Sequence, residues 1–106
     1  MDYSITVQKL KERIDNGDKI FILDVREAWE HSMAKIDGSI LISLGELPQS
    51  LDQLDKEQEI VCYCHHGMRS FQVCNYLENN DFNKVLNLDG GIDSWAKTID
   101  TDMAQY

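Results

Sequence analysis

The sequence is short of positive charge. Among 106 residues there are 10 lysines and arginines against 19 aspartates and glutamates, which gives a formal net charge of -9. Nucleic acids and anionic membrane surfaces bind proteins mainly through positive charge, so this balance argues against both as partners. An anion-binding site on this chain would have to be a local positive spot on an acidic molecule.

Long apolar runs are missing as well. No run approaches the roughly 20 apolar residues that a membrane-spanning helix needs, and Met1-Asp2-Tyr3-Ser4 does not begin a basic-then-apolar signal peptide. The three cysteines are an odd number and too few for a disulfide framework. Together these absences predict a cytoplasmic protein with reduced thiols.

Repeats, low-complexity tracts and linkers are absent, and Pro48 is the single proline. A chain of this length is expected to form one domain, residues 1–106. Apolar runs alternate with helical patterns, which predicts an α/β fold with a mostly parallel sheet and helices on both faces. The expected strands are 19–25, 39–42, 59–63 and 84–87, all buried, and the expected helices are 6–14, about 27–33, 44–54 with a break near Pro48, 70–78 and 92–99.

Polar segments follow three of these strands. Asp24-Val25-Arg26 ends one strand, Cys64 follows another, and Asp89-Gly90-Gly91 follows a third. Ligands of parallel α/β sheets bind at the carboxyl ends of the strands. We therefore expect the three segments to meet at one edge of the sheet.

Cys64 is the best candidate for a reactive group. It opens the segment Cys64-His65-His66-Gly67-Met68-Arg69-Ser70, which lies between an expected strand and an expected helix. Backbone N–H groups and the helix dipole favour an anion there, and Arg69 adds positive charge, so the thiolate is favoured. Gly67 permits a tight curl that aims those N–H groups inward. We predict that Cys64 is a nucleophile.

The other polar residues of this loop are expected to assist Cys64. His65 and His66 are expected to line the site rather than to move protons, since a preformed thiolate needs no base. Arg69 is expected either to bind a substrate oxyanion or to brace the loop. Ser70 is expected to be the N-cap of the next helix.

Asp24 and Arg26 have two interpretations: a solvated pair at the end of a strand, or a pair that supports the loop from behind. His31 is expected to be exposed and without a function. Cys62, within a strand, and Cys74, within a helix, are expected to be buried and inert.

Metal binding and redox chemistry are two further functions that the cysteines could have. The spacing Cys62-x-Cys64-His65-His66 lacks the second ligand pair of a zinc site, so we expect no metal and no cofactor. A disulfide between Cys64 and Cys62 or Cys74 ranks low. We expect Cys62 and Cys64 to face opposite sides of the sheet, and Cys74 to lie on the buried side of its helix.

Four segments resemble the single-domain rhodanese-like sulfurtransferases over nearly the whole chain. They are residues 22–27 (ILDVRE), 36–40 with 44–47 (IDGSI and LGEL), 64–70 (CHHGMRS) and 89–95 (DGGIDSW). The resemblance implies a five-stranded, mostly parallel sheet with the cysteine loop at its carboxyl edge. Residues 34–39 depart from the family's Gly-His-Ile-Pro-Gly-Ala, and we expect this departure to change only the local loop shape.

The resemblance also implies an activity. Cys64 would attack the outer sulfur of a donor such as thiosulfate, hold a persulfide, and pass the sulfur to cyanide or a thiol. By the same match, the substrate is cradled by His65, His66, Gly67, Met68 and Arg69, and Trp95 packs the closing helix. The acidic surface suggests in addition a protein sulfur acceptor with a basic patch.

Two other functions stay open. Cysteine phosphatases, some of which share this fold, use the spacing Cys-x5-Arg, whereas Cys64 and Arg69 are separated by four residues, which makes a smaller cradle that suits sulfur better than phosphate. A non-catalytic rhodanese-like binding or sensing module is the other alternative. Such modules often lack the loop cysteine, which is present here.

Overall fold

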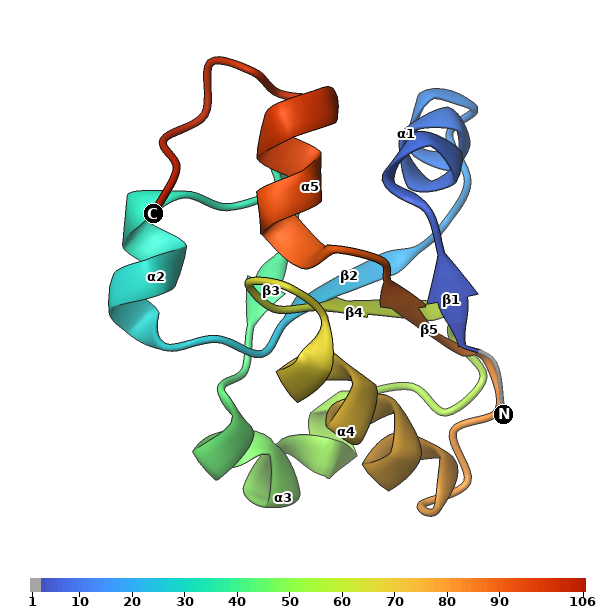
Figure 1. Ribbon diagram of the computed structural model, residues 1–106. Coiled ribbons are helices and arrows are strands. Elements are labelled where there is room, and N and C mark those ends of the chain that lie inside the picture. The colour runs from blue at the N-terminus through green and yellow to red at the C-terminus, as the bar shows by residue number, and fades with distance from the viewer. Residues whose placement is uncertain (1–2) are drawn as a thin grey trace.

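The computed structural model describes residues 3–106, so residues 1–2 of the expected domain lie outside the described part (Figure 1). One sheet is built from β1 (Ser4–Ile5), β2 (Phe21–Asp24), β3 (Ile40–Leu41), β4 (Ile60–Tyr63) and β5 (Val85–Leu88). The sheet has five strands in the order β1-β5-β4-β2-β3, and every neighbouring pair is parallel. The predicted α/β class is confirmed.

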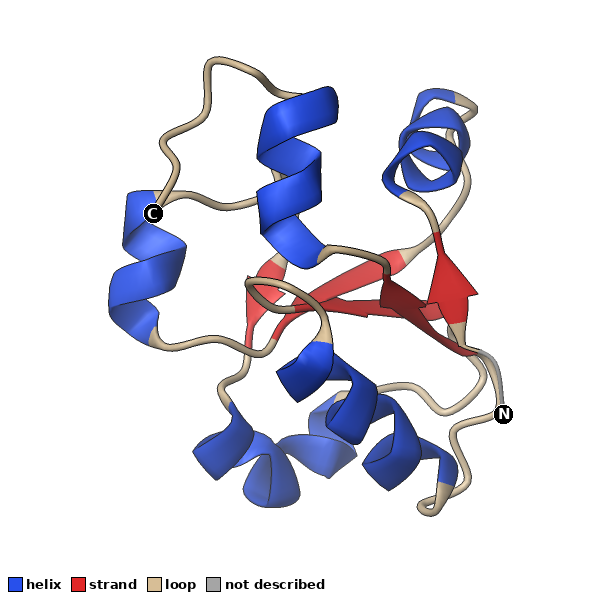
Figure 2. Ribbon diagram, viewed as in Figure 1, coloured by secondary structure: helices blue, strands red, loops and turns tan. Residues whose placement is uncertain are grey.

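Helices cover both faces of the sheet (Figure 2). They are α1 (Val7–Asp15), α2 (Ala28–Met33), α3 (Leu47–Ser50), α4 (Met68–Glu78) and α5 (Gly91–Thr98), with short 3-10 turns η1 (Leu44–Glu46) and η2 (Leu51–Gln53) around α3. In Figure 1, α1 and α5 lie on one face, and α3 and α4 lie on the other. Parallel strands need this double cover because both of their faces are apolar.

Strand β4 lies in the middle of the sheet and divides the core into two layers. Its side chains alternate between the faces, as in any strand. Cys62 packs with Val73 and Leu77 of α4, whereas Val61 and Tyr63 pack in the layer that lies under α1 and α5. Cys64 lies two residues after Cys62 and packs in the same layer, against α4.

Both edge strands differ from the expectations. The two-residue β1 was not expected, because it is too short for an apolar alternation to be visible, and it pairs with β5 through Ser4 and Ile5. Residues 39–42 were expected to form a buried strand. That was wrong for Ile40, which is 50% exposed. It lies in β3, which has only β2 as a neighbour, and edge strands are open to water on one side.

The helix after Cys64 begins earlier than expected. Helix α4 starts at Met68, and its N-cap is Gly67 in the left-handed region, with φ of +118°. Ser70 therefore lies within the first turn, so the prediction that it is the N-cap was wrong. Its hydroxyl is directed to the cysteine loop instead. Within residues 3–106, no helix is both long enough and apolar enough to cross a membrane.

Candidate active site

The segments that follow β2, β4 and β5 meet at one edge of the sheet, as predicted. Asp24, the last residue of β2, is in register with Tyr63, the last residue of β4. The first turn of α5 then holds the cysteine loop from the β5 side. The Ile92 amide donates to the Cys64 carbonyl at 2.9 Å, and the Asp93 amide donates to the His65 carbonyl at 3.0 Å.

Gly91 makes this close approach feasible. Its φ is +59°, and a Cβ atom added there would lie 2.4 Å from the His65 carbonyl oxygen and 2.5 Å from that of Cys64. Any other residue would have to push the backbone of the cysteine loop away. The backbone at Gly91 therefore packs directly against the cysteine loop and limits the path that the loop can take.

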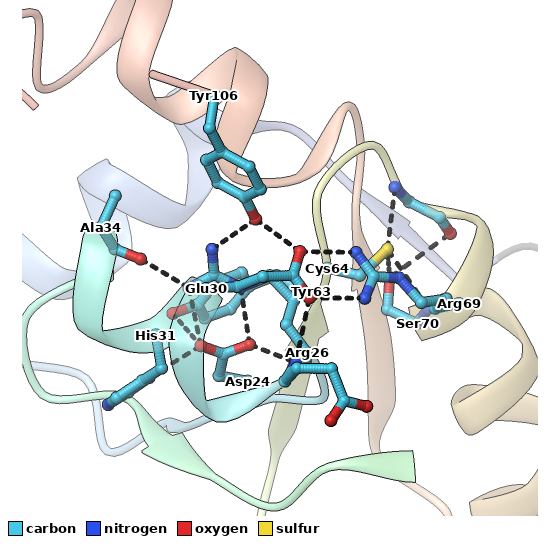
Figure 3. A network of polar contacts seen from close by, with 12 residues as sticks. Asp24, Arg26, Glu30, His31, Ala34, Tyr63, Cys64, Arg69, Ser70 and Tyr106 are labelled. Carbon is cyan, nitrogen blue, oxygen red and sulfur yellow. Dashed lines mark hydrogen bonds and ion pairs between the residues drawn. The ribbon is translucent and has the colours of Figure 1, made fainter. Parts of the chain in front are cut away.

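The Cys64 thiol lies in a cradle of hydrogen-bond donors (Figure 3). Its Sγ accepts from the Gly67 amide at 3.1 Å, from the Ser70 amide at 3.5 Å and from the Ser70 hydroxyl at 3.4 Å. Burial raises the pKa of the thiol, but these donors and the Arg69 amide outweigh burial and hold the pKa below its ordinary value. The loop therefore favours the thiolate relative to an ordinary cysteine, although the sulfur is largely buried.

Asn87, on β5, holds Gly67 and Ser70 of the cradle in place. No pattern in the sequence predicted this role. Its amide nitrogen donates to the Gly67 carbonyl at 3.1 Å, and its side-chain oxygen accepts from the Ser70 hydroxyl. The single hydroxyl proton of Ser70 is thus shared between Asn87, the Gly67 carbonyl and the Cys64 sulfur. Asn87 fixes the residues that face the sulfur on two sides.

Arg69 braces the loop against α2. Its Nη1 and Nη2 donate to the two carboxylate oxygens of Glu30 at 2.8 and 2.9 Å, a bidentate pair. The Arg69 hydrogen bonds lower the pKa of the nearly buried Glu30 to about 2. Glu30 also accepts from the Glu27 amide at 3.0 Å, as the second half of a capping box at the start of α2.

Asp24 and Arg26 form a buried pair, so the interpretation as a solvated pair was wrong. Neither has any exposed surface. Arg26 donates to both Asp24 oxygens, through Nε at 2.8 Å and Nη2 at 2.7 Å. Burial raises the pKa of Asp24, but its hydrogen bonds to Arg26 and His31 lower it further than burial raises it. The carboxylate therefore stays charged in the interior.

His31 is part of this network, which contradicts its expected exposure. Its Nδ1 lies 2.7 Å from Asp24 Oδ2, and its side chain is 20% exposed. The Tyr63 hydroxyl donates to the same oxygen of Asp24 at 3.1 Å and also contacts Ser39 Oγ at 2.9 Å. Ser39 lies in the segment that departs from the family pattern, and it is tied to β4 by this contact.

A family model for the rhodanese-like domain matches residues 6–98. The chain belongs to the single-domain rhodanese-like sulfurtransferase family. YtwF of Bacillus subtilis (strain 168) is 37% identical over 91 residues, which are 86% of this chain and 87% of that protein. The thiosulfate sulfurtransferase GlpE of Tolumonas auensis (strain DSM 9187 / NBRC 110442 / TA 4) is 32% identical over 76 residues, 72% of each chain. The crystal structure of SSP1007 from Staphylococcus saprophyticus subsp. saprophyticus is similar at 35% identity, with a TM-score of 0.84, over 93% of this chain and 97% of that one.

The other two cysteines of this rhodanese-like protein are poor nucleophiles. Cys62 and Cys74 are fully buried. A hydrogen bond to Cys74, together with burial, raises the pKa of Cys62. The expectation that Cys62 and Cys64 face opposite sides of the sheet was wrong, because residues two apart on a strand share a face, and both lie in the α4 layer. All three cysteines are free thiols.

The histidines of the rhodanese-like loop are stacked. The rings of His65 and His66 have centroids 4.1 Å apart, and those of His65 and Tyr106 are 4.0 Å apart. Burial and the neighbouring His66 lower the pKa of His65. Met68 is 80% exposed beside the loop, and of the residues expected to cradle a substrate it is Gly67 that donates a hydrogen bond to the Cys64 sulfur.

One group in the described part of the chain has the donor chemistry for a metal ion. The ligand atoms of His65, His66 and Asp93 lie within 4.8 Å of one another. Asp93 is already paired with Lys97 at 3.0 Å, and the His65 ring is held in a stack. Asp93 and His65 therefore already have partners, and a metal ion bound here would have to replace these contacts.

Sequence reasoning missed Glu30, Tyr63, Asn87 and Tyr106. The capping box of Glu27 and Glu30 was a visible signal for Glu30, since an acidic N-cap residue is followed by a glutamate three positions later. The other three act at long range. The Tyr63 hydroxyl meets Asp24 across 39 positions, and Asn87 and Ser70 are 17 positions apart. No local spacing indicates such contacts.

Proposed function

We propose that this protein transfers a sulfane sulfur from thiosulfate, or a similar small sulfur-containing anion, to cyanide or a thiol through a persulfide on Cys64. The observation that carries the proposal is the cradle of the Gly67 and Ser70 amides around the Cys64 sulfur. Donors fixed in this way stabilise an anionic sulfur without any reorganisation when charge develops. The likeness to the GlpE thiosulfate sulfurtransferase supports the choice of donor.

The reaction follows two displacement steps. The Cys64 thiolate attacks the outer sulfur of thiosulfate, a sulfur–sulfur bond forms on Cys64, and sulfite leaves with the electron pair of the broken sulfur–sulfur bond. Cyanide then attacks the outer sulfur of the persulfide, and thiocyanate forms as the Cys64 thiolate is released. Neither step needs a proton transfer.

In this proposal the loop residues divide into two groups. The amides of Gly67 and Ser70 stabilise the negative charge of the Cys64 thiolate. His65, His66 and Met68 line the approach to it. The Arg69 side chain braces the loop through Glu30, so its charge is not free for the donor anion.

A groove beside the cysteine loop offers room for a larger thiol acceptor. Met68 and Phe71 are exposed large apolar side chains on the first turn of α4. They line a groove of about 390 Å³ together with His66, Gly67 and Asn87. Thiosulfate and cyanide have no apolar surface that would use such side chains, whereas a protein thiol does. Because the thiols are free, a reducing compartment such as the cytoplasm fits this role.

Phosphatase activity is the second candidate, and the loop length counts against it. The loop holds four residues between Cys64 and Arg69, and the guanidinium is bound to Glu30 rather than turned to the cradle. A phosphate would need that positive charge for its oxygens. A binding module without catalysis would not need the donors that favour the Cys64 thiolate.

Mass spectrometry of the intact protein after incubation with thiosulfate tests the proposal. We expect a gain of one sulfur atom that maps to Cys64 and disappears on addition of cyanide, with thiocyanate appearing in equal amount. Cys64→Ser is expected to take up no sulfur, whereas Cys74→Ser, the matched control on α4, is expected to behave as the native protein does. No sulfur on Cys64, or hydrolysis of an aryl phosphate without any sulfur transfer, contradicts the proposal.

A further inference from the structure

Tyr106 lies outside residues 6–98, the part of the chain that the family model matches. The segment 99–106 leaves the end of α5 and returns to α2 (Figure 1). Met103 and Tyr106 of this segment pack against the core layer under α1 and α5. The segment thus brings a tyrosine to the back of the cysteine loop that the family pattern does not account for.

The Tyr106 hydroxyl lies between two charged side chains of the active-site network. It accepts a hydrogen bond from Arg26 Nη1 at 2.7 Å and donates one to Glu30 Oε2 at 2.8 Å (Figure 3). It is therefore the direct connection between the buried Asp24–Arg26 pair and the Glu30–Arg69 pair. Burial raises the pKa of this hydroxyl to about 12, so it keeps its proton at any working pH.

The Tyr106 ring has separate contacts. It stacks on His65, with centroids 4.0 Å apart and an interplanar angle of 15°, and it meets the Trp29 ring edge-on at 5.7 Å. His65 directly follows Cys64 and is held between Tyr106 and His66. Tyr106 is therefore linked to the loop in two ways. Its ring contacts His65 directly, and its hydroxyl acts on Arg69 indirectly, by way of Glu30.

We propose that Tyr106 is a positioning residue for the Cys64 loop, with its hydroxyl fixing the Glu30–Arg69 brace and its ring fixing His65. This inference rests on the proposed use of Cys64 as a nucleophile. Arg69 directly precedes Ser70, whose amide and hydroxyl donate to the Cys64 sulfur, and the Arg69 side chain is held by Glu30. Removing the hydroxyl leaves Arg26 Nη1 without its acceptor and Glu30 with one donor fewer, so the brace loosens and the amides aim less well at the sulfur.

Two variants separate the roles of the hydroxyl and the ring. Tyr106→Phe removes only the hydroxyl, whereas Tyr106→Leu removes the stacked ring as well. The pH dependence of Cys64 alkylation by iodoacetamide measures the thiolate directly, without any sulfur transfer. We expect Tyr106→Phe to move the midpoint upward, so that the thiolate fraction at pH 7 falls by about threefold to tenfold.

A nuclear magnetic resonance titration of the histidines reads the second contact. In Tyr106→Phe the His65 ring keeps its stacking partner, so its titration is expected to match that of the native protein. In Tyr106→Leu the ring becomes more exposed, and its pKa is expected to rise toward the ordinary value, since burial is the main cause of its lowering. A His65 titration unchanged in Tyr106→Leu overturns the role of the ring.

Tyr3→Phe is the matched control for the hydroxyl. The Tyr3 hydroxyl also lies between polar side chains, Asn75 at 2.9 Å and Glu78 at 3.1 Å, but on the far end of α4 from the loop. We expect it to change the melting temperature without moving the alkylation midpoint. An unchanged midpoint in Tyr106→Phe, or a shift of equal size in Tyr3→Phe, overturns the positioning role of Tyr106. The proposed sulfur transfer fails on a different result, the absence of a Cys64 persulfide in the native protein.

Discussion

Cys64 combines two properties that oppose each other. It is nearly buried, which favours the neutral thiol, yet its sulfur faces several N–H and O–H donors, which favour the thiolate. The donors win because they belong to a loop whose backbone is already fixed, so no ordering is needed when the charge forms. Cys62, two positions earlier, is buried without such donors, and its pKa rises.

Replacing Ser70 by alanine tests how much one donor contributes. Ser70→Ala removes the hydroxyl 3.4 Å from the sulfur but keeps the Ser70 amide. The thiolate is the reactive form, so reactivity rises with pH and levels off above the pKa. Losing a donor to the thiolate raises that pKa, and we expect the midpoint of iodoacetamide alkylation to move upward by about one pH unit, or ~1.4 kcal/mol.

Ser50→Ala serves as the control, because the Ser50 hydroxyl donates to the Glu46 carbonyl at 2.9 Å and lies outside the cysteine loop. It is expected to leave the alkylation midpoint unchanged. A midpoint in Ser70→Ala that stays in place or moves downward would mean that the hydroxyl proton belongs to Asn87 and not to Cys64.

At the scale of elements, the start of α5 shapes the site more than its sequence suggests. Gly91 is both the first residue of α5 and the surface against which the Cys64 and His65 carbonyls rest. Two hydrogen bonds from the amides of α5 then hold those carbonyls. The helix therefore acts on the loop through its backbone, while its side chains, Trp95 among them, pack in the core.

Gly91→Ala is expected to lower both stability and reactivity. The added Cβ would overlap two backbone carbonyls, and the φ of +59° is strained for alanine, so we expect a loss of about 2–4 kcal/mol in the free energy of unfolding. Because the displaced carbonyls belong to the loop, the rate of Cys64 alkylation at pH 7 is expected to fall as well. Urea denaturation and the alkylation rate measure the two effects.

Gly17→Ala is the matched control at the end of α1. Gly17 has a similar φ of +78°, but nothing lies within 4 Å of a Cβ placed there. It is expected to cost only the backbone strain, about 1 kcal/mol, and to leave alkylation unchanged. Equal losses of stability in the two variants would mean that the contact with the loop carries no weight.

The central strands and the helices followed from local patterns, and the edges did not. The apolar run of residues 20–23 and the run of residues 60–63 indicated buried parallel strands, and Cys64 at a strand end indicated the edge where the site lies. The two-residue β1 is defined only by its pairing with β5, and the exposure of Ile40 only by its place at the opposite edge. Such features depend on neighbours that the local sequence does not contain.

The site likewise has residues that the local sequence predicts and residues whose role depends on distant parts of the chain. Cys64 and Gly67 lie three positions apart in one loop with a recognisable composition, so their placement could be predicted. Ser70 was assigned to a cap because serine is common there, but Gly67 occupies the cap and frees the hydroxyl for the sulfur. Tyr106 meets Arg26 across 80 positions of sequence, and no periodicity relates the two.

At the scale of the whole molecule, the charge of -9 opposes the approach of any anion. Charges close to the loop largely cancel. Arg69 is paired with Glu30, Arg26 with Asp24, and Lys97 with Asp93. The attraction for an anion near Cys64 therefore comes from backbone N–H groups and acts over a short range, while the repulsion from the acidic body acts over a long range.

Salt is expected to speed the reaction with anions. Raising the ionic strength from about 0.01 M to about 0.15 M shortens the screening length from about 30 Å to about 8 Å. We expect the alkylation of Cys64 by iodoacetate, an anion, to become about two- to threefold faster. Iodoacetamide, which is neutral and of similar size, is the control and is expected to react at an unchanged rate. A slower reaction of iodoacetate at high salt would mean that positive potential at the loop outweighs the acidic body.

The order of the strands also bears on the synthesis of the protein. Cys64 leaves the ribosome before Asn87, Ile92 and Tyr106, yet these residues hold its loop from β5, from α5 and from the segment beyond it. Chain growth proceeds from the N-terminus, so a nascent chain carries the cysteine without the contacts that shape its loop. The loop is completed only as these later-made elements dock, and a nascent chain that stops before them accordingly lacks the assembled thiolate site.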